Sequence, residues 1–227
     1  MNYSEIRRTA REKLVGNWGI AIGATFVAAL FGATVAGTGF RLDLELDAEQ
    51  LHRLPETVLP FIKAWMSIAG ILGLVQFIIG GTVQLGYCRF LLNLQDGREL
   101  NFHDLFSQFH RFGQGFAQAF LTTLYSILWG LLFIIPGIIK AISYSMTPFI
   151  MAGHPEMSAK EAIDASKALM DGYKGDYFIL GLTFIGWELL NLLTLGIGSL
   201  WLNPYMNASF AAFYRKILHE RRYSIED

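Results

Sequence analysis

Six polar side chains lie within stretches of the sequence that are otherwise apolar, and they are the residues best placed to do chemistry inside a membrane. They are Lys140, Tyr144, Glu188, Asn191, Asn203 and Asn207. Ionisable groups in hydrocarbon are costly and usually face a protein interior or a cavity, so they are the strongest pointers to function in such a chain. Lys140 and Tyr144 are one helical turn apart, and so are Glu188 and Asn191.

The spacing allows these six side chains to converge in the outer half of the membrane, with Lys140 paired to Glu188. One interpretation is an outward-facing polar cavity that binds a lipid headgroup, an ion or a proton. The other is a buried ion pair that fixes helix register, or a lysine that extends to the outer interface. The second interpretation is favoured, and the six residues are kept as candidate ligand-binding residues.

Signatures of soluble-type catalysis are missing from the sequence. No P-loop, GxGxxG, HExxH or GxSxG pattern occurs. His103 and His110 are seven residues apart and can share a helix face, but no third ligand follows at a suitable spacing. We therefore predict no catalytic residues, no metal site and no cofactor. The single cysteine, Cys88, excludes an intrachain disulfide and is interpreted as a small packing residue.

The composition indicates a membrane protein. Of the 227 residues, 53% are hydrophobic and 16% are charged, and the mean hydropathy is +0.38. Soluble domains are closer to a quarter charged, so much of this protein's surface is expected to face lipid. The formal net charge of −1 gives no basic excess for nucleic acid, and no nucleic-acid partner is predicted.

The elements that position the polar residues are predicted to be membrane-spanning helices, because ~20 apolar helical residues cross a bilayer. The sequence predicts six spans in three hairpins: 18–40, 64–92, 116–135, 138–152, 177–195 and 199–216. Pro136-Gly137 and the glycine-rich residues 195–199 divide the second and third hairpins, since proline removes a helix donor and glycine permits a turn. The expected fold is therefore all-α.

Lysine and arginine set the predicted orientation, since they are retained on the cytoplasmic side. With the N-terminus inside, fourteen of the 18 basic residues are cytoplasmic, and the acidic outer loop 41–63 holds three. Both termini are expected in the cytoplasm, and the chain is expected to cross the membrane several times. The first apolar run is longer than the core of a signal peptide, so we expect it to be retained.

A repeat of three units organises residues 1–227 into a single membrane domain. Glycine–aromatic junctions follow an amphipathic stretch near residues 16, 113 and 172. We interpret 1–17 as a cytoplasmic interfacial helix with its apolar face on acyl chains, 18–92 as the first hairpin, and 93–152 and 153–227 as the second and third units. The alternative is the repetition that any protein of apolar hairpins shows.

Several short motifs resemble a bacterial family. The residues that carry the resemblance are Ile135–Lys140, Tyr144–Phe149, Glu161-Ala162-Ile163, Ser166-Lys167, Met170-Asp171-Gly172, Gly186-Trp187, Leu195–Gly198, Pro204-Tyr205 and Phe213-Tyr214. Together they are similar to DUF975, domain of unknown function 975, over roughly residues 100–218. The resemblance implies an integral membrane protein, most often of Gram-positive bacteria, and brings no activity or catalytic residues. Lys140 belongs to the family pattern.

Three functions remain as hypotheses from the sequence. The leading one is a non-enzymatic module that binds membrane lipids, another membrane protein or a second copy of itself, and supports envelope homeostasis or transport. The first alternative is a transporter of a small solute or lipid that uses the Lys140 and Glu188 region. An intramembrane enzyme is the least favoured, because no nucleophile–base pair is evident.

Overall fold

The computed structural model describes residues 1–33 and 59–226, and this part of the chain is all-helical, with no strand. The predicted outer loop 41–63 lies mostly outside the described residues. The helices are α1 (Tyr3–Leu14), α2 (Trp18–Leu30), α4 (Leu59–Asp96), α5 (His103–Phe106), the 3₁₀ turn η1 (Phe109–Arg111), α6 (Phe112–Leu132), α7 (Ile134–Tyr144), α8 (Thr147–Gly153), α9 (Ala159–Leu169), α10 (Lys174–Leu182), α11 (Ile185–Leu193) and α12 (Ser199–Glu226).

Four helical segments of the described residues are long and apolar enough to cross a membrane. They are Ser67–Asp96, His103–Leu132, Ile135–Gly153 and Lys174–Leu193. The pair α1 and α2 passes the same test only jointly, across a bend of 103°. The structure therefore supports an all-α membrane protein with four to five candidate spans, and the six-span, three-hairpin layout stays a prediction.

The predicted first span is wrong as one continuous helix over 18–40. The backbone of Gly32 has a φ of +72°, a left-handed conformation that glycine adopts without strain. Its N–H donates to the carbonyl of Ala29 at 3.0 Å, and the N–H of Ala33 donates to the carbonyl of Ala28 at 2.9 Å. This is the hydrogen-bond pattern of a Schellman cap, and it ends α2 at Leu30. Residues 34–40 are outside the described part.

The second hairpin turns earlier than the sequence predicted. Phe133 is extended, with φ −158° and ψ 137°, and it separates α6 from α7. Pro136 and Gly137 lie in the first turn of α7, where a proline costs no helical hydrogen bond. Gly137 is needed for close packing instead, because a Cβ there would lie 2.7 Å from the Cα of Gly130 on α6.

Helix α12 matches the predicted helix that starts at Ser199, but it is not among the candidate spans. Every residue from 204 to 214 is buried, including the polar Asn207 and Ser209. A helix surrounded by protein on all sides is a central packing element rather than a lipid-facing one. The sixth span over 199–216 is therefore unsupported.

The interfacial helices also bury their apolar faces differently from the prediction. Ile6, Ala10 and Leu14 of α1 are buried in the protein, not left for acyl chains. The guanidinium of Arg7 lies 5.2 Å from the ring centroid of Phe184 and its Nε donates to the hydroxyl of Tyr205 at 3.3 Å. Helix α1 is thus fixed to the rest of the protein by aromatic and hydrogen-bond contacts.

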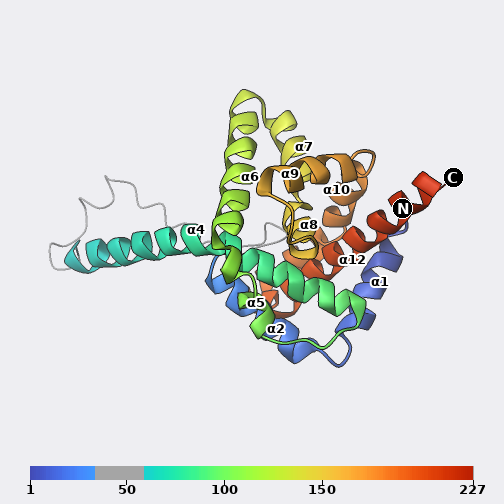
Figure 1. Cartoon of the computed structure of the whole chain (residues 1–227). Helices are drawn as coiled ribbons and strands as arrows, with labels where there is room; N and C mark the ends of the chain where they lie inside the picture. The colour runs from blue at the N-terminus through green and yellow to red at the C-terminus, as the bar shows by residue number, and fades with distance from the viewer. Residues whose placement is uncertain (34–58, 227) are drawn as a thin grey trace.

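The described chain divides into two regions (Figure 1). The helical core consists of α1, α2, residues 80–96 of α4, α5, α8, α9 and residues 202–218 of α12, and it contains most of the buried residues. The apolar arms are residues 59–79, 123–142 and 185–201, where most large apolar side chains are exposed. In Figure 1 the first half of α4 and the α6–α7 hairpin leave the core in different directions. Lipid is the solvent that suits such arms.

Candidate functional site

The structure does not form the predicted ion pair between Lys140 and Glu188. The ammonium of Lys140 lies 4.8 Å from the ring centroid of Trp129, across the α6–α7 hairpin. The carboxylate of Glu188 accepts a hydrogen bond from the Nδ2 of Asn191 at 3.4 Å, within α11. Each group has a local partner, so the structure brings Glu188 to Asn191 but not to Lys140.

The other predicted site residues are also dispersed. Tyr144 is buried, and its ring contacts the ring of Tyr125 at 6.1 Å between centroids. Asn207 is buried on α12 and donates to the hydroxyl of Tyr87 at 3.0 Å. Asn203 is half-buried near the start of α12. None of the six lines either of the two hollows described next.

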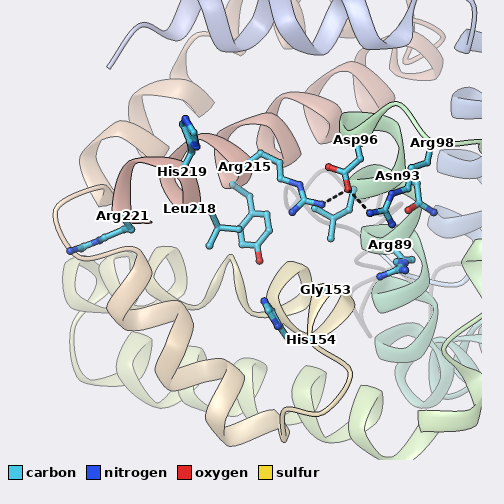
Figure 2. Close-up of a pocket in the computed structure, with 12 residues that line it drawn as sticks. Arg89, Asn93, Asp96, Arg98, Gly153, His154, Arg215, Leu218, His219 and Arg221 are labelled. Carbon is cyan, nitrogen blue, oxygen red and sulfur yellow. Dashed lines mark hydrogen bonds and ion pairs between the residues drawn. The ribbon is translucent and has the colours of Figure 1, made fainter. Parts of the chain in front are cut away.

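A pocket of about 670 Å³ opens where two candidate spans end against α12 (Figure 2). Its walls come from the last turns of α4, the end of α8 and the second half of α12. The lining residues are Arg89, Leu92, Asn93, Asp96, Arg98, Gly153, His154, Tyr214, Arg215, Leu218, His219 and Arg221. We call this hollow the basic pocket, because its described lining has four arginines and a single carboxylate.

The end of α4 places two charges of opposite sign at the pocket. Gly97 has a φ of +68°. Its N–H donates to the carbonyl of Leu94 at 3.3 Å, and the N–H of Arg98 donates to the carbonyl of Asn93 at 2.9 Å. This Schellman cap reverses the chain, so that Arg98 lies 3.7 Å from the carboxylate of Asp96. Asp96 also receives a hydrogen bond of 2.6 Å from Arg215 of α12.

Arginines also satisfy the exposed carbonyls at helix C-termini around the pocket. Arg89 donates to the carbonyl of Ala152 at 3.3 Å, in the last turn of α8. Arg221 donates to the carbonyl of Ala168 at 3.2 Å, in the last turn of α9. A cation at a helix C-terminus is favourable, both for the unsatisfied carbonyls and for the helix dipole. These two arginines therefore have a structural role in addition to lining the pocket.

Arg98 differs from them because no helix carbonyl among the described residues accepts a hydrogen bond from it. Its side chain is 61% exposed and forms an ion pair of 3.7 Å with Asp96. An exposed pair at that distance contributes little to stability. Arg98 is thus the arginine of the pocket most available to a ligand.

His154 lies at the edge of the pocket and is paired outside it. Its ring Nδ1 is 3.2 Å from the carboxylate of Glu156. The backbone N–H of Glu156 itself and the His154 ring hold the pKa of the Glu156 carboxyl below its usual value. The partner of His154 in this contact, Glu156, is not part of the pocket lining.

A second hollow of about 530 Å³ lies beside the basic pocket and shares Arg89, Asn93 and Arg98 with it. Its lining also includes Glu99 and Asp104, so its two arginines are matched by two carboxylates. Asn93 donates to Asp104 at 3.0 Å. The excess of positive charge is therefore confined to the basic pocket.

The lining of the basic pocket is suited to binding anions. Arginine offers a planar fork of donors that matches the oxygens of phosphate and carboxylate groups. Among the described residues, no group of three His, Cys, Asp or Glu is placed to hold a metal ion. The chemistry that the basic pocket supports is the binding of an anion.

Sequence reasoning missed this site, because it counted Arg89, Arg98 and Arg215 only as cytoplasmic charges. One signal was present: Arg89 is the single charged residue between Lys63 and Asp96. A lone arginine near the end of an apolar segment is expected to face protein or a cavity. The contribution of α12, over a hundred residues later, had no such signal.

The family model described as Protein of unknown function (DUF975) matches residues 131–221. This confirms the resemblance carried by the motifs between Ile135 and Tyr214. The matched region includes Arg215 and Arg221 of the basic pocket, whereas Arg89 and Arg98 precede it. No curated protein and no solved structure matches the chain.

Proposed function

We propose that this chain is a non-enzymatic membrane protein that binds the anionic headgroup of a membrane lipid in the basic pocket. The observation that carries the proposal is the place of the pocket. It lies at the C-terminal ends of the candidate spans Ser67–Asp96 and Ile135–Gly153, the depth at which headgroups lie, and its lining is rich in arginine.

The inner leaflet of a bacterial cytoplasmic membrane is the side that fits this pocket. The positive-inside rule assigns segments rich in lysine and arginine to the cytoplasm, and Arg89, Arg98, Arg215 and Arg221 belong to such segments. In this orientation both termini are cytoplasmic and the apolar arms extend into lipid. The anionic surface of that leaflet attracts basic groups by ~1 kcal/mol for each side chain.

The size and mixed lining of the pocket suit a lipid headgroup. Ligand pockets typically measure about 300–1,000 Å³, and this one has about 670 Å³. Leu92 and Leu218 add apolar surface beside the arginines. A headgroup joined to acyl chains satisfies both kinds of surface, because its phosphate pairs with guanidinium groups while the glycerol and upper chains contact the leucines.

The local partners of Lys140 and Glu188 support this proposal over the transport alternative. A shared polar site requires the two side chains to meet, and they are engaged with Trp129 and Asn191 instead. Binding of another membrane protein, or of a second copy through the exposed arms, stays a prediction.

The test is lipid binding by the full chain, purified in neutral detergent and titrated with phosphatidylglycerol or phosphatidylcholine under native mass spectrometry. Arg98→Gln removes one positive charge from the pocket. Unlike the side chains of Arg89 and Arg221, that of Arg98 has no hydrogen bond to a helix carbonyl among the described contacts. Lys160→Gln is the matched control, since Lys160 is exposed on α9 and lines neither hollow. We expect the wild type to prefer phosphatidylglycerol, and Arg98→Gln to weaken its binding about five-fold, equivalent to ~1 kcal/mol.

Lys160→Gln should change that affinity less than two-fold, roughly the scatter of such titrations, because exposed charges away from the site are screened. Equal affinity of the wild type for the two lipids would remove the basis of the proposal. So would an equal loss in Arg98→Gln and Lys160→Gln, since the effect would then reflect overall charge and not the pocket.

A further inference from the structure

We infer that Asp96 sets the charge of the ligand: it limits the basic pocket to a headgroup with one negative charge, a phosphodiester, and disfavours doubly charged phosphomonoesters. This inference rests on the proposed function and names the ligand class of the same site.

Asp96 stands where an anion would otherwise bind. The Nη2 atoms of Arg215 and Arg98 approach the same carboxylate oxygen, Oδ2, at 2.6 Å and 3.7 Å. Figure 2 shows both side chains directed at Asp96, with Arg89 below them on the same wall of the pocket. Arg221 lies at the other end of the pocket from Asp96. Of the charged residues that line the basic pocket, Arg89, Arg98 and Arg215 thus lie on the side of Asp96, while Glu99 and Asp104 line the neighbouring hollow and not this one.

The net positive charge near Asp96 is balanced by a ligand with about one negative charge. Three arginines against one aspartate give an excess of two positive charges. The C-termini of α4 and α8 both end at this wall, and each carries about half a negative charge from the helix dipole. Together the helix ends offset about one of the two positive charges, so the net charge near Asp96 is about +1.

A phosphodiester matches this balance better than a phosphomonoester does. A phosphodiester carries one negative charge, whereas a phosphomonoester carries about 1.5 to 2 at neutral pH, because its second pKa is near 6. Attraction to the arginines grows in proportion to the ligand charge, but the cost of removing an ion from water grows with its square. The second negative charge would also be repelled by Asp96, and it would find no unmatched arginine.

The test compares phosphatidylglycerol, a phosphodiester, with phosphatidic acid, a phosphomonoester, on the full chain in neutral detergent. Asp96→Asn keeps the shape of the side chain and removes its charge. Glu99→Gln is the matched control, because Glu99 lies three residues away and lines the second hollow only. We expect the wild type to bind phosphatidylglycerol more tightly than phosphatidic acid.

In Asp96→Asn the affinity for phosphatidic acid should rise about five-fold more than that for phosphatidylglycerol. In Glu99→Gln the ratio of the two affinities should stay within about two-fold of the wild type, since exposed charges are screened. A wild type that prefers phosphatidic acid would overturn the inference, and this readout needs no variant to fold.

If the ratio of the affinities for phosphatidylglycerol and phosphatidic acid is unchanged in a folded Asp96→Asn, the inference is overturned as well. The proposed function then still holds, provided that the chain binds phosphatidylglycerol more tightly than phosphatidylcholine. Equal affinities for phosphatidylglycerol and phosphatidylcholine would instead overturn the proposed function. Glycerophosphoglycerol, the water-soluble diester without acyl chains, distinguishes the source of the ligand. Weak competition by it supports a lipid, and competition equal to that of phosphatidylglycerol would overturn the lipid assignment.

Discussion

The two halves of α4 belong to one continuous helix but differ in which side chains they expose and which they bury. In residues 59–79 most of the large apolar side chains that the structure describes are exposed, Ile71 and Leu74 both at 63%. In residues 80–95 the buried positions include polar Thr82, Asn93 and Gln95 together with Leu and Phe side chains. A water-soluble helix would place its apolar residues inside throughout. One helix therefore passes from lipid, in its first half, into the protein interior, in its second half.

The glycines of α4 show the same change. Outside the backbone of α4 itself, a Cβ on Gly70 or Gly73 would meet no atom of the described residues within 4 Å. A Cβ on Gly81 would clash with the backbone of Gly115, and one on Gly86 with the carbonyl of Leu105. Small residues in the second half therefore let backbones approach closely, as in packed membrane helices, whereas those in the first half have no such neighbour within the described chain.

A charge placed in the exposed first half of α4 is expected to have the largest effect. Ile71→Lys is expected to lower membrane insertion by at most ~3 kcal/mol, the cost of a lysine at the centre of a span, since Ile71 lies toward the start of the candidate span Ser67–Asp96. Ile71→Ala is the control, since it stays apolar and fills no packed site. The measurement is the fraction of full-length chain recovered in the membrane after expression. Normal recovery of Ile71→Lys would mean that water, not lipid, surrounds this half of α4.

Glycine-to-alanine substitutions in the two halves of α4 are expected to have smaller effects that differ between the halves. Gly86→Ala forces a methyl group into the backbone of α5 and is expected to destabilise the protein by about 2 kcal/mol. Gly70→Ala meets open space and removes a helix-interior glycine, so it should be neutral or stabilising by a few tenths of a kcal/mol, roughly. Thermal unfolding in detergent measures both. Equal effects would show that the two halves pack alike.

Helical class and element position were predictable from the sequence, because apolar run length decides which segments suit lipid. The prediction of a helix over 64–92 corresponds to α4, whereas the predicted turn at Pro136-Gly137 lies at Phe133 in the structure. The end of the first span was not, since the left-handed cap at Gly32 looks like any other glycine in an apolar run. Helix α12 was misinterpreted for a related reason: burial by protein and immersion in lipid select similar side chains, and only tertiary contacts separate them.

The site was less predictable than the fold. Local spacing found the contact between Glu188 and Asn191, which belong to one helix. The predicted pairing of Lys140 with Glu188 joins two different helices. Local residue spacing does not determine which helices are neighbours in a bundle, so this pairing could not be derived from it. The contact between Asp96 and Arg215 joins residues 119 positions apart and could not be foreseen for the same reason.

The smallest test concerns a hydrogen-bond chain that exists only in the buried half of α4. Thr25 donates to the carbonyl of Ala21 at 2.7 Å, so the hydroxyl of Tyr87 donates to Thr25 at 2.8 Å and accepts from Asn207 at 3.0 Å. Tyr87→Phe leaves the buried amide of Asn207 without this acceptor, and we expect a loss of about 1 kcal/mol in stability.

Tyr125→Phe on the exposed hairpin is the matched control, since the hydroxyl of Tyr125 has no hydrogen bond among the described contacts, and its loss should leave the unfolding midpoint unchanged. If lipid and protein were equivalent surroundings for these helices, the two substitutions would shift the midpoint equally. A larger shift for Tyr87→Phe is expected because a polar group cannot find water inside the helical core, so each buried hydroxyl there depends on its protein partner.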